Sequence, residues 1–268
     1  MIQSASKVAT AHGQLLEVCY SGGKDSDVIL ELTKMAGVPY RAIYKNTSID
    51  PSGTIKHAKE MGVEIMQPKK RFFELVAENG FPSRFMRFCC RYLKEYKILD
   101  YAILGIRSEE SKLRAKRYKE PELCHVYNKK EKVRQYLPIL NWSEEDITEF
   151  AVARKIVFHP LYYDERGNFH PERRLGCLCC PLQSYKERLK SFKENPNMVK
   201  LYCKYGGEWF KNHKQTKTAQ RLKDIYEMFT FSVFCKNMQE FNKKFGETLF
   251  DDGIDCKRFL ENYFNIKF

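Results

Sequence analysis

The sequence predicts an α/β protein whose first part is a doubly wound, mostly parallel sheet and whose last part is a helical appendage. Apolar strand-like stretches alternate with helix-like stretches up to about residue 181, which is typical of a parallel sheet covered on both faces. From about residue 182 the strand signals stop, and aromatic and aliphatic residues recur at helical spacing, as in Tyr185, Leu189 and Phe192. We therefore expect two domains, residues 1–181 and 182–268.

The elements of the α/β part follow from apolar periodicity and from helix-start signals. The expected strands are Leu15–Tyr20, Tyr40–Tyr44, Val63–Met66, Tyr101–Ile106 and an extended stretch ending with Val133–Leu140. The expected helices are Ser26–Ala36, Thr54–Met61, Arg71–Glu78, Arg84–Leu99 and Ser143–Arg154. Ser143 and Asp146 form an acidic variant of the capping box at the start of the last helix. Ligands of such sheets bind at the carboxyl ends of the strands, where polar runs follow Tyr20 and Ile106.

Composition restricts the class of protein. The 268 residues are 43% hydrophobic, enough for a core, and no apolar run approaches the roughly 20 residues of a membrane span. Residues 1–12 lack the apolar centre of a signal peptide, so a cytoplasmic location without membrane contact is expected. Ten cysteines then indicate metal or redox chemistry more than a disulfide framework. The net charge of +13 favours a polyanionic partner, a nucleotide or a nucleic acid, although a solvated basic surface is an alternative.

The run Ser21-Gly22-Gly23-Lys24-Asp25-Ser26 predicts a phosphate site. It lies between a buried strand and a helix, so its glycine turn brings backbone N–H groups and the positive end of the helix dipole together. The Ser21 and Ser26 hydroxyls and the Lys24 ammonium add further donors. The spacing differs from that of a Walker A loop. A glycine turn that binds nothing is the alternative, but the strand–turn–helix context favours phosphate.

Two short cysteine clusters predict a metal centre. Cys89 and Cys90 are adjacent, and Cys177 and Cys180 form a C-x-x-C pair. Four thiolates can hold one iron–sulfur cluster or one zinc ion, and ligand type alone does not separate the two. Buried structural cysteines are the alternative, and Cys179 has no assigned role. Three basic residues flank the first pair and would favour thiolates and a thiolate-bound cluster: Arg87, Arg91 and Lys94.

A second basic run follows the strand that ends near Ile106. Arg107 and Arg114 could point at one anion, with the hydroxyls of Ser108 and Ser111 as additional donors. Guanidinium forks match phosphate or sulfate oxygens in a bidentate way. A solvated helix face is the alternative interpretation of the same residues.

These motifs occur in the order found in the phosphoadenylyl-sulfate (PAPS) reductase family of PP-loop ATP pyrophosphatases, which the chain resembles from about residue 14 to residue 185. Asn46-Thr47-Ser48 stands where that family usually has an acidic-Thr-Gly turn. The matching segments are the pyrophosphate loop Ser21–Ser26, the R-x-C-C segment Arg87–Arg91, the G-x-R-x-x-x-S-x-x-R segment Gly105–Arg114, the P-[LI]-x-x-W segment Leu137–Trp142 with Asp146, and the closing segments His159–Tyr163 and Gly176–Cys180.

The resemblance implies the PP-loop fold, an adenine nucleotide site and a [4Fe–4S] cluster on Cys89, Cys90, Cys177 and Cys180. The nucleotide is ATP, or APS or PAPS, with Mg²⁺ oriented by Asp25. The implied catalytic residues are Lys24, Asp25 and Arg107. The implied nucleotide-binding residues are Ser21, Gly22, Gly23, Lys24, Asp25, Ser26, Asn46, Gly105, Arg107 and Arg114.

The sequence is compatible with three functions. The leading one is an ATP-dependent enzyme that adenylylates a substrate oxygen and releases pyrophosphate, after which sulfur displaces AMP with the cluster assisting. The second is a sulfonucleotide reductase, although the family's E-C-G-L segment with its nucleophilic cysteine does not occur and Cys256 lies in a different context. The third is a non-catalytic, nucleotide-dependent nucleic-acid-binding module. A sulfur-donor protein as partner and an oligomeric state stay open.

Overall fold

The computed structural model describes residues 1–127, 130–246 and 253–268, which divide into two compact units. Unit 1 consists of Met1–Pro68 and Arg91–Gly176, and unit 2 of Lys69–Cys90 and Cys177–Phe268. The chain therefore leaves unit 1 twice. A domain boundary after residue 181 remains a prediction, and that prediction did not include the segment 69–90 that packs with the C-terminal helices.

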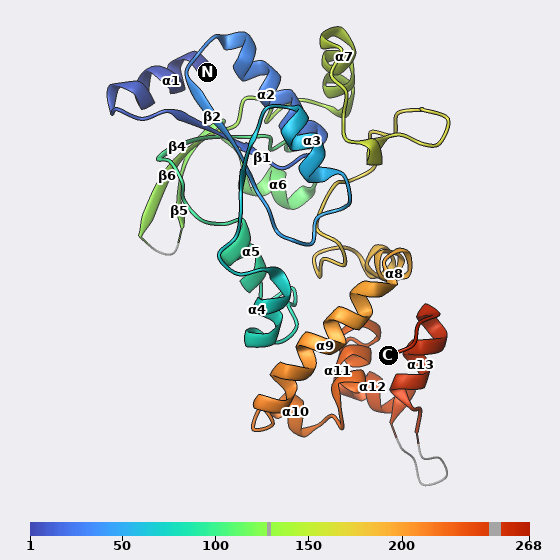
Figure 1. Ribbon diagram of the computed structural model, residues 1–268. Helices are drawn as coiled ribbons and strands as arrows, with labels where there is room; N and C mark the ends of the chain where they lie inside the picture. Colours follow the sequence, from blue (N-terminus) through green and yellow to red (C-terminus); the bar gives the residue numbers. More distant parts are fainter. Residues whose placement is uncertain (128–129, 247–252) are drawn as a thin grey trace. The chain divides into compact units, whose positions relative to one another are not determined.

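Unit 1 is built around a six-stranded sheet with strand order β3-β2-β1-β4-β6-β5 (Figure 1). The strands are β1 (Leu16–Tyr20), β2 (Tyr40–Lys45), β3 (Glu64–Met66), β4 (Tyr101–Leu104), β5 (Glu122–Tyr127) and β6 (Glu131–Tyr136). All neighbouring pairs are parallel except β5 and β6, which are antiparallel. The predicted doubly wound, mostly parallel α/β class is confirmed.

Helices flank this sheet on both sides (Figure 1). They are α1 (Ile2–Ala11), α2 (Lys24–Ala36), α3 (Thr54–Glu60), α6 (Lys112–Arg117), α7 (Glu144–Arg154) and the 3₁₀ helix η1 (Pro160–Tyr162). The predicted capping box is present at α7, where the Asp146 N–H donates to Ser143 Oγ over 3.0 Å. Val28 and Ile29 of α2 are fully buried, and with Leu16 and Val18 of β1 they form the centre of the core. The strand β1 and the helix α2 thus hold the turn between them on a rigid base.

Two predicted elements differ from the structure. The expected helix over residues 84–99 is reduced to α5 (Phe88–Leu93). Before it, Ser83 Oγ accepts the N–H groups of Phe85 and Met86 in a turn, and after it the Tyr96 carbonyl accepts Lys45 Nζ over 2.6 Å. Lys45 Nζ also donates to the Lys94 carbonyl over 3.4 Å, and a helix continuing to residue 99 would use that carbonyl. The strand β5 is an addition at the sheet edge, and its alternating exposure is that of an amphipathic strand.

Unit 2 is helical, which confirms the predicted C-terminal helices. It contains α4 (Phe72–Asn79), α8 (Tyr185–Glu194), α9 (Pro196–Asn212), α10 (Lys217–Gln220), α11 (Ile225–Phe234), α12 (Met238–Phe245) and α13 (Cys256–Phe264). Its core is aromatic: the Tyr202 ring lies 5.4 Å from that of Phe81, 5.6 Å from that of Phe192 and 6.1 Å from that of Phe229. A Cβ at Gly206 would lie 2.2 Å from the Phe81 ring, so only glycine permits this packing.

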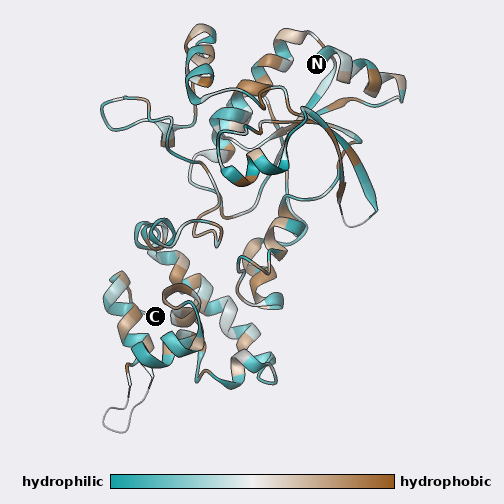
Figure 2. Cartoon of the chain, turned by 180° about the vertical axis from the view of Figure 1, so that it is seen from behind, coloured by the Kyte–Doolittle hydropathy of each residue, from teal (hydrophilic) through white to brown (hydrophobic). Residues whose placement is uncertain are grey.

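Hydrophobic and hydrophilic residues alternate along the same helical ribbons in both units, as the brown and teal segments of Figure 2 show. This alternation is what a helix with one buried face requires. Within the described residues, no helix combines the length and apolar character needed to span a bilayer.

Candidate functional site

The predicted phosphate loop is a tight turn between β1 and α2. Gly22 has φ 81°, and a Cβ there would lie 2.8 Å from Thr54 Cγ2, so glycine is required at this position. Gly23 is extended and is the N-cap of α2, whose start receives no side-chain cap. Inside the turn, Ser26 Oγ donates to the Gly23 carbonyl over 2.6 Å. The N-cap itself supplies no side-chain acceptor, so the positive end of α2 faces the turn as an anion site requires, although the Lys24 N–H already donates to Tyr162 Oη.

Lys24, Asp25 and Arg107 lie together beside this loop. The Arg107 side chain is buried and donates to three carboxylates: Asp25 over 2.8 Å, Glu109 over 3.0 Å and Glu144 over 2.5 Å. Lys24 Nζ lies 3.0 Å from Glu144 Oε1. Burial alone would lower the pKa of Arg107, but the charges of Asp25 and Glu144 raise it. The loop is therefore bordered by an ion network in which every cation already has a carboxylate partner.

Gly105 explains how the end of β4 reaches this network. A Cβ at Gly105 would lie 2.8 Å from the Asp25 carbonyl oxygen, so the strand end and the first turn of α2 approach at backbone distance. Arg107 follows two residues later and reaches Asp25. The sequence pattern that begins at Gly105 thus has a physical basis in close packing.

Two other predicted nucleotide-binding residues have partners of their own. Arg114 lies on α6, is partly exposed and pairs with Glu110. Asn46 is buried after β2, where its Nδ2 donates to Gln67 Oε1 over 2.8 Å. Convergence of Arg107 and Arg114 on one anion stays a prediction, because each guanidinium pairs with carboxylates of the chain itself.

A buried polar layer behind the loop was not predicted from the sequence. Asp27 is fully buried one residue after the loop, where Tyr20 Oη donates to its Oδ1 over 2.5 Å and His57 Nε2 lies 3.0 Å from its Oδ2. Burial raises the pKa of Asp27, and the bond to His57 opposes this rise. Tyr20, Asp27 and His57 come from β1, α2 and α3. This layer ties the loop to its neighbours.

Two residues of the His159–Tyr163 segment complete the surroundings of the loop. Tyr162 Oη accepts the Lys24 N–H over 3.3 Å, and a Cβ at Gly23 would lie 3.3 Å from the same oxygen. His159 is buried, its Nδ1 accepts the Leu161 N–H over 3.0 Å, and its ring faces that of His57 edge-on at 5.7 Å. The H-P-L-Y pattern marked this segment in the sequence, but gave neither residue a role.

The four predicted metal ligands all belong to unit 2. The pKa of the Cys89 thiol is raised by its hydrogen bond with Cys90, by burial and by the charge of Cys180, so the adjacent pair is in contact. Cys177 precedes Cys180 by three residues on the same segment. Within residues 1–127, 130–246 and 253–268, no three His, Cys, Asp or Glu side chains already stand at metal-binding spacing. A metal centre on these residues stays a proposal.

Two buried hydrogen-bond donors in the same unit indicate whether an anionic group would fit beside these thiols. Arg188 Nε and Tyr202 Oη are buried and have no hydrogen-bond partner among the described residues. Burial raises the pKa of Tyr202, and the cysteines Cys179, Cys89 and Cys180 would raise it further if they were ionised. Unpartnered buried donors are costly, so they indicate an acceptor in the complete site. A thiolate-bound cluster is such an acceptor, and the residues fit it.

Cys179, which had no assigned role, is explained by local packing. Its sulfur is buried, its N–H donates to Ser191 Oγ over 2.9 Å, and the same hydroxyl lies 3.6 Å from Sγ. Burial raises the pKa of this thiol to about 11. Its backbone has φ 55°, a left-handed angle that a non-glycine residue adopts at a cost. Cys179 therefore shapes the C-x-x-C turn as a neutral thiol.

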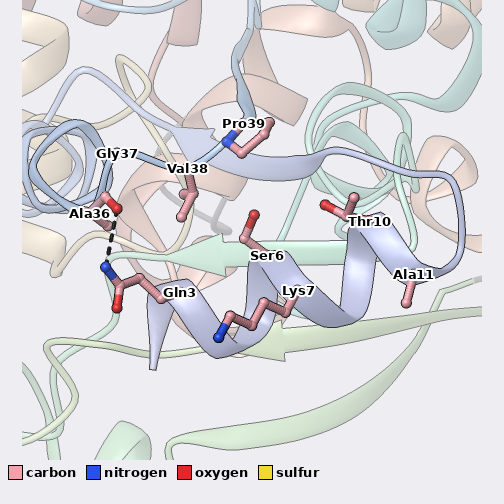
Figure 3. Close-up of a pocket in the computed structure, with 9 residues that line it drawn as sticks. All are labelled: Gln3, Ser6, Lys7, Thr10, Ala11, Ala36, Gly37, Val38 and Pro39. Carbon is pink, nitrogen blue, oxygen red and sulfur yellow. Dashed lines mark hydrogen bonds between the residues drawn. The ribbon is translucent and has the colours of Figure 1, made fainter.

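One pocket of about 640 Å³ lies at the opposite end of α2 from the phosphate loop (Figure 3). Across it, Gln3 Nε2 donates to the Ala36 carbonyl over 3.3 Å. The 13 residues of α2 place it roughly 20 Å from the loop. None of the predicted site residues lines it; its lining residues are Gln3, Ser6, Lys7, Thr10, Ala11, Ala36, Gly37, Val38 and Pro39.

Curated relatives of this chain share less than a third of their residues with it. An uncharacterized protein of Methanocaldococcus jannaschii is 29% identical over 212 residues, which are 73% of this chain and 42% of the relative. Sulfate adenylyltransferase subunit 2 of Rhizobium johnstonii is 28% identical over 184 residues, which are 56% of this chain and 58% of the relative. The chain thus spans well under two thirds of the length of these relatives.

Solved structures resemble the chain more distantly. Phosphoadenylyl-sulfate (PAPS) reductase from Candida auris, in a phosphate complex, has a TM-score of 0.45 and 16% identity over 66% of this chain and 87% of the other. FMN adenylyltransferase of Candida glabrata has a TM-score of 0.38 and 16% identity over 55% and 49%. TM-scores below 0.5 do not support an inference about the function of this chain.

The decisive comparison is with a protein family. The phosphoadenosine phosphosulfate reductase domain matches residues 16–183, more than half of the chain. The match begins at β1 and runs through the loop, both cysteine pairs and the segment of Tyr162. The chain belongs to the phosphoadenosine phosphosulfate reductase domain family.

Proposed function

We propose that this chain is an adenine-nucleotide-binding enzyme that adenylylates a substrate oxygen with ATP and then allows sulfur to displace AMP. The observation that carries the proposal is the glycine turn Ser21–Ser26 at the N-terminus of α2, which has no side-chain cap and is bordered by Lys24 and Arg107. Backbone donors, a helix dipole and two cations suit a polyphosphate. The family match and the name of the sulfate adenylyltransferase relative support sulfur chemistry.

In this proposal the loop positions the phosphates. The backbone at Gly22 and Gly23 would approach the β- and γ-phosphates, and Lys24 would exchange Glu144 for a phosphate oxygen. The substrate oxygen attacks the α-phosphorus and gives up its proton, the bond to the bridging oxygen breaks, and pyrophosphate leaves with the bonding electron pair; Mg²⁺ held at Asp25 would partly neutralise its charge. In the second step a sulfide-level nucleophile, hydrosulfide, attacks the activated substrate carbon, the carbon–oxygen bond breaks, and AMP leaves with the bonding electron pair. Catalysis is then mainly positioning and charge neutralisation.

Cys89, Cys90, Cys177 and Cys180 would hold the proposed [4Fe–4S] cluster, with zinc as the other metal that such thiolates accept. When bound, the cluster supplies one-electron redox capacity. The chain's own part is to place these cysteines in unit 2, where the Cys89 and Cys90 thiols are hydrogen-bonded to each other.

The second candidate is a sulfonucleotide reductase, which the family name favours. Such an enzyme needs a nucleophilic thiol, and Cys256 is a poor one. It is buried at the start of α13, and burial raises its pKa to about 11, so little thiolate forms at neutral pH. The non-catalytic nucleic-acid-binding module remains the third candidate. A partner subunit or a sulfur-donor protein is likewise a proposal.

Parallel assays on anaerobically purified protein test the function. We expect ATP with Mg²⁺ to release pyrophosphate in the presence of a suitable acceptor, and APS or PAPS with thioredoxin to release no steady sulfite. Arg107→Ala should weaken turnover by roughly 1.5–3 kcal/mol, the size of a charge-assisted contact. Steady sulfite release that Cys256→Ser abolishes would establish the reductase instead. Nucleotide binding without any turnover would favour the non-catalytic module.

A further inference from the structure

Helices α8 and α9 carry two buried donors toward the cysteines of unit 2. Arg188 lies on α8 and Tyr202 on α9, in the C-terminal segment that the sequence predicted only as a helical appendage. Arg188 Nε and Tyr202 Oη have no hydrogen-bond partner among the described residues. All these residues belong to one compact unit, and contacts link them: the Cys179 N–H donates to Ser191 Oγ on α8 over 2.9 Å, and both Arg188 and Tyr202 lie 5.6 Å from the Phe192 ring.

Packing fixes both side chains. Tyr202 is 1% exposed, and its ring is enclosed by those of Phe72, Phe81 and Phe192 at centroid distances of 5.7, 5.4 and 5.6 Å. Its hydroxyl cannot turn to solvent without leaving this enclosure. Arg188 is held at its other end, where Nη1 donates to the Ser232 carbonyl over 3.1 Å and the guanidinium lies 5.6 Å from the Phe192 ring centroid.

The charge near the thiols is positive and lacks a carboxylate. In the described part of the chain, Arg188 forms no ion pair with Asp or Glu, although burial lowers its pKa and Arg84 lowers it further. Tyr202, Cys179 and Cys180 would raise its pKa only in their ionised forms, and burial keeps Tyr202 and Cys179 neutral. A buried cation is stable when an anion is paired with it, so this arrangement is complete only with negative charge at the sulfurs.

We propose that Arg188 and Tyr202 are positioning residues that donate Nε–H and Oη–H hydrogen bonds to the sulfurs of the iron–sulfur cluster and thereby set its reduction potential. This inference rests on the proposed cluster. Donors to cluster sulfur stabilise the reduced, more negative form, so they raise the potential. The C-terminal helices are then part of the cofactor site.

The test uses the full chain, reconstituted anaerobically with iron and sulfide, with potentials read by electron paramagnetic resonance. Tyr202→Phe and Arg188→Gln should keep the cluster spectrum but shift the potential downward, by about 59 mV for a tenfold change in the reduced-to-oxidised ratio of a one-electron couple. Arg188→Lys keeps the charge without the Nε donor and should fall between Arg188→Gln and wild type. Tyr205→Phe on α9 and the exposed Lys186→Gln on α8 are the matched controls.

A second readout does not depend on loading. In the metal-free protein, Tyr202→Phe removes an unpartnered buried hydroxyl, so the thermal midpoint of the variant should equal or exceed that of wild type. In the protein loaded with the cluster, the same variant should lose iron faster than wild type. If wild type takes up no iron and sulfide, or only zinc, the proposed cluster fails. If wild type takes up the cluster and both variants keep its potential and its rate of iron loss, this inference alone is overturned.

Discussion

Arg107 in unit 1 and Arg188 in unit 2 are both cations beside a candidate site, but their surroundings are opposite. Arg107 is buried against three carboxylates, at 2.5 to 3.0 Å. Arg188 leaves its Nε without any acceptor in the described chain, next to thiols. Arg107 therefore has carboxylate partners from the protein, whereas Arg188 has none in the described residues.

This difference predicts how each site would bind its ligand. At the phosphate loop, a nucleotide must exchange with existing ion pairs, such as that of Lys24 with Glu144 at 3.0 Å. Such exchange favours discrimination between ligands over raw affinity. At the cysteines, an anionic group would satisfy donors that nothing else satisfies, which favours tight, permanent binding.

The largest effect is expected for Cys90→Ser, because a missing thiolate ligand removes a metal centre and the folding energy linked to it. Anaerobic protein should change from brown to nearly colourless, with iron reduced to a small fraction of the wild-type content and a lower thermal midpoint. Cys124→Ser, an exposed thiol on β5, serves as the control. Full iron content in Cys90→Ser would remove Cys90 from the ligand set.

Arg107→Ala should lower the free energy of unfolding by about 3 kcal/mol, the lower end of the cost of breaking a buried pair, since Glu109 and Glu144 are partly exposed. Urea unfolding measures this change. Arg41→Ala is the matched control, because Arg41 makes an exposed pair with Glu64 at 2.7 Å and should cost at most about 1 kcal/mol. Equal losses in the two variants would mean that burial adds nothing to the Arg107 network.

Gly23→Val should weaken nucleotide binding at least tenfold, about 1.4 kcal/mol, while leaving the core nearly intact. Gly23 has an extended backbone that valine tolerates, and its side chain would point toward Tyr162 Oη and the phosphate position. Gly22→Ala should instead destabilise the fold, since φ is 81° and Thr54 lies 2.8 Å away. Equilibrium binding of ATP and thermal unfolding separate the two effects. Unchanged affinity in Gly23→Val would move the nucleotide site elsewhere.

The smallest effect concerns pH. Burial and the neighbouring His57 lower the pKa of His159 from its ordinary value of 6.5. The folded protein therefore binds fewer protons than the unfolded chain near that pH, so the free energy of unfolding should fall as pH falls below about 6.5. Protonation of Nδ1 would also break its bond with the Leu161 N–H. Urea titrations at several pH values should show a shallower decline in His159→Gln, and an unchanged decline would assign it to other groups.

Local sequence signals predicted the phosphate loop and most of the sheet. A buried strand, two glycines and a helix start are contiguous, so Ser21–Ser26 could be interpreted without knowing what packs against it. The Ser143–Asp146 capping box was predictable for the same reason. The helix predicted over residues 84–99 is shorter because Lys45, from outside the helical pattern, donates to backbone carbonyls near its C-terminal end.

Long-range charge pairing could not be predicted. The predicted role of Arg107 as a phosphate ligand is untested, but its pairing with Glu144 could not be foreseen, since Glu144 lies 37 residues further along the chain, on α7. The sequence analysis did not identify Tyr202 or Arg188, because an unpartnered buried donor is visible only once its surroundings are known. Asp27 and His57 were missed likewise, since their pairing joins α2 to α3.

Two of the three points where the chain passes between its two units coincide with cysteines. The last residue of the first excursion into unit 2 is Cys90, and the first residue of the second excursion is Cys177. A metal centre that joins these two residues would cross-link the chain at both ends of the segment 91–176. It would shorten the loops available to the unfolded chain in the way a disulfide does. Cofactor loading would then stabilise the folded chain by reducing the conformational entropy of its unfolded state.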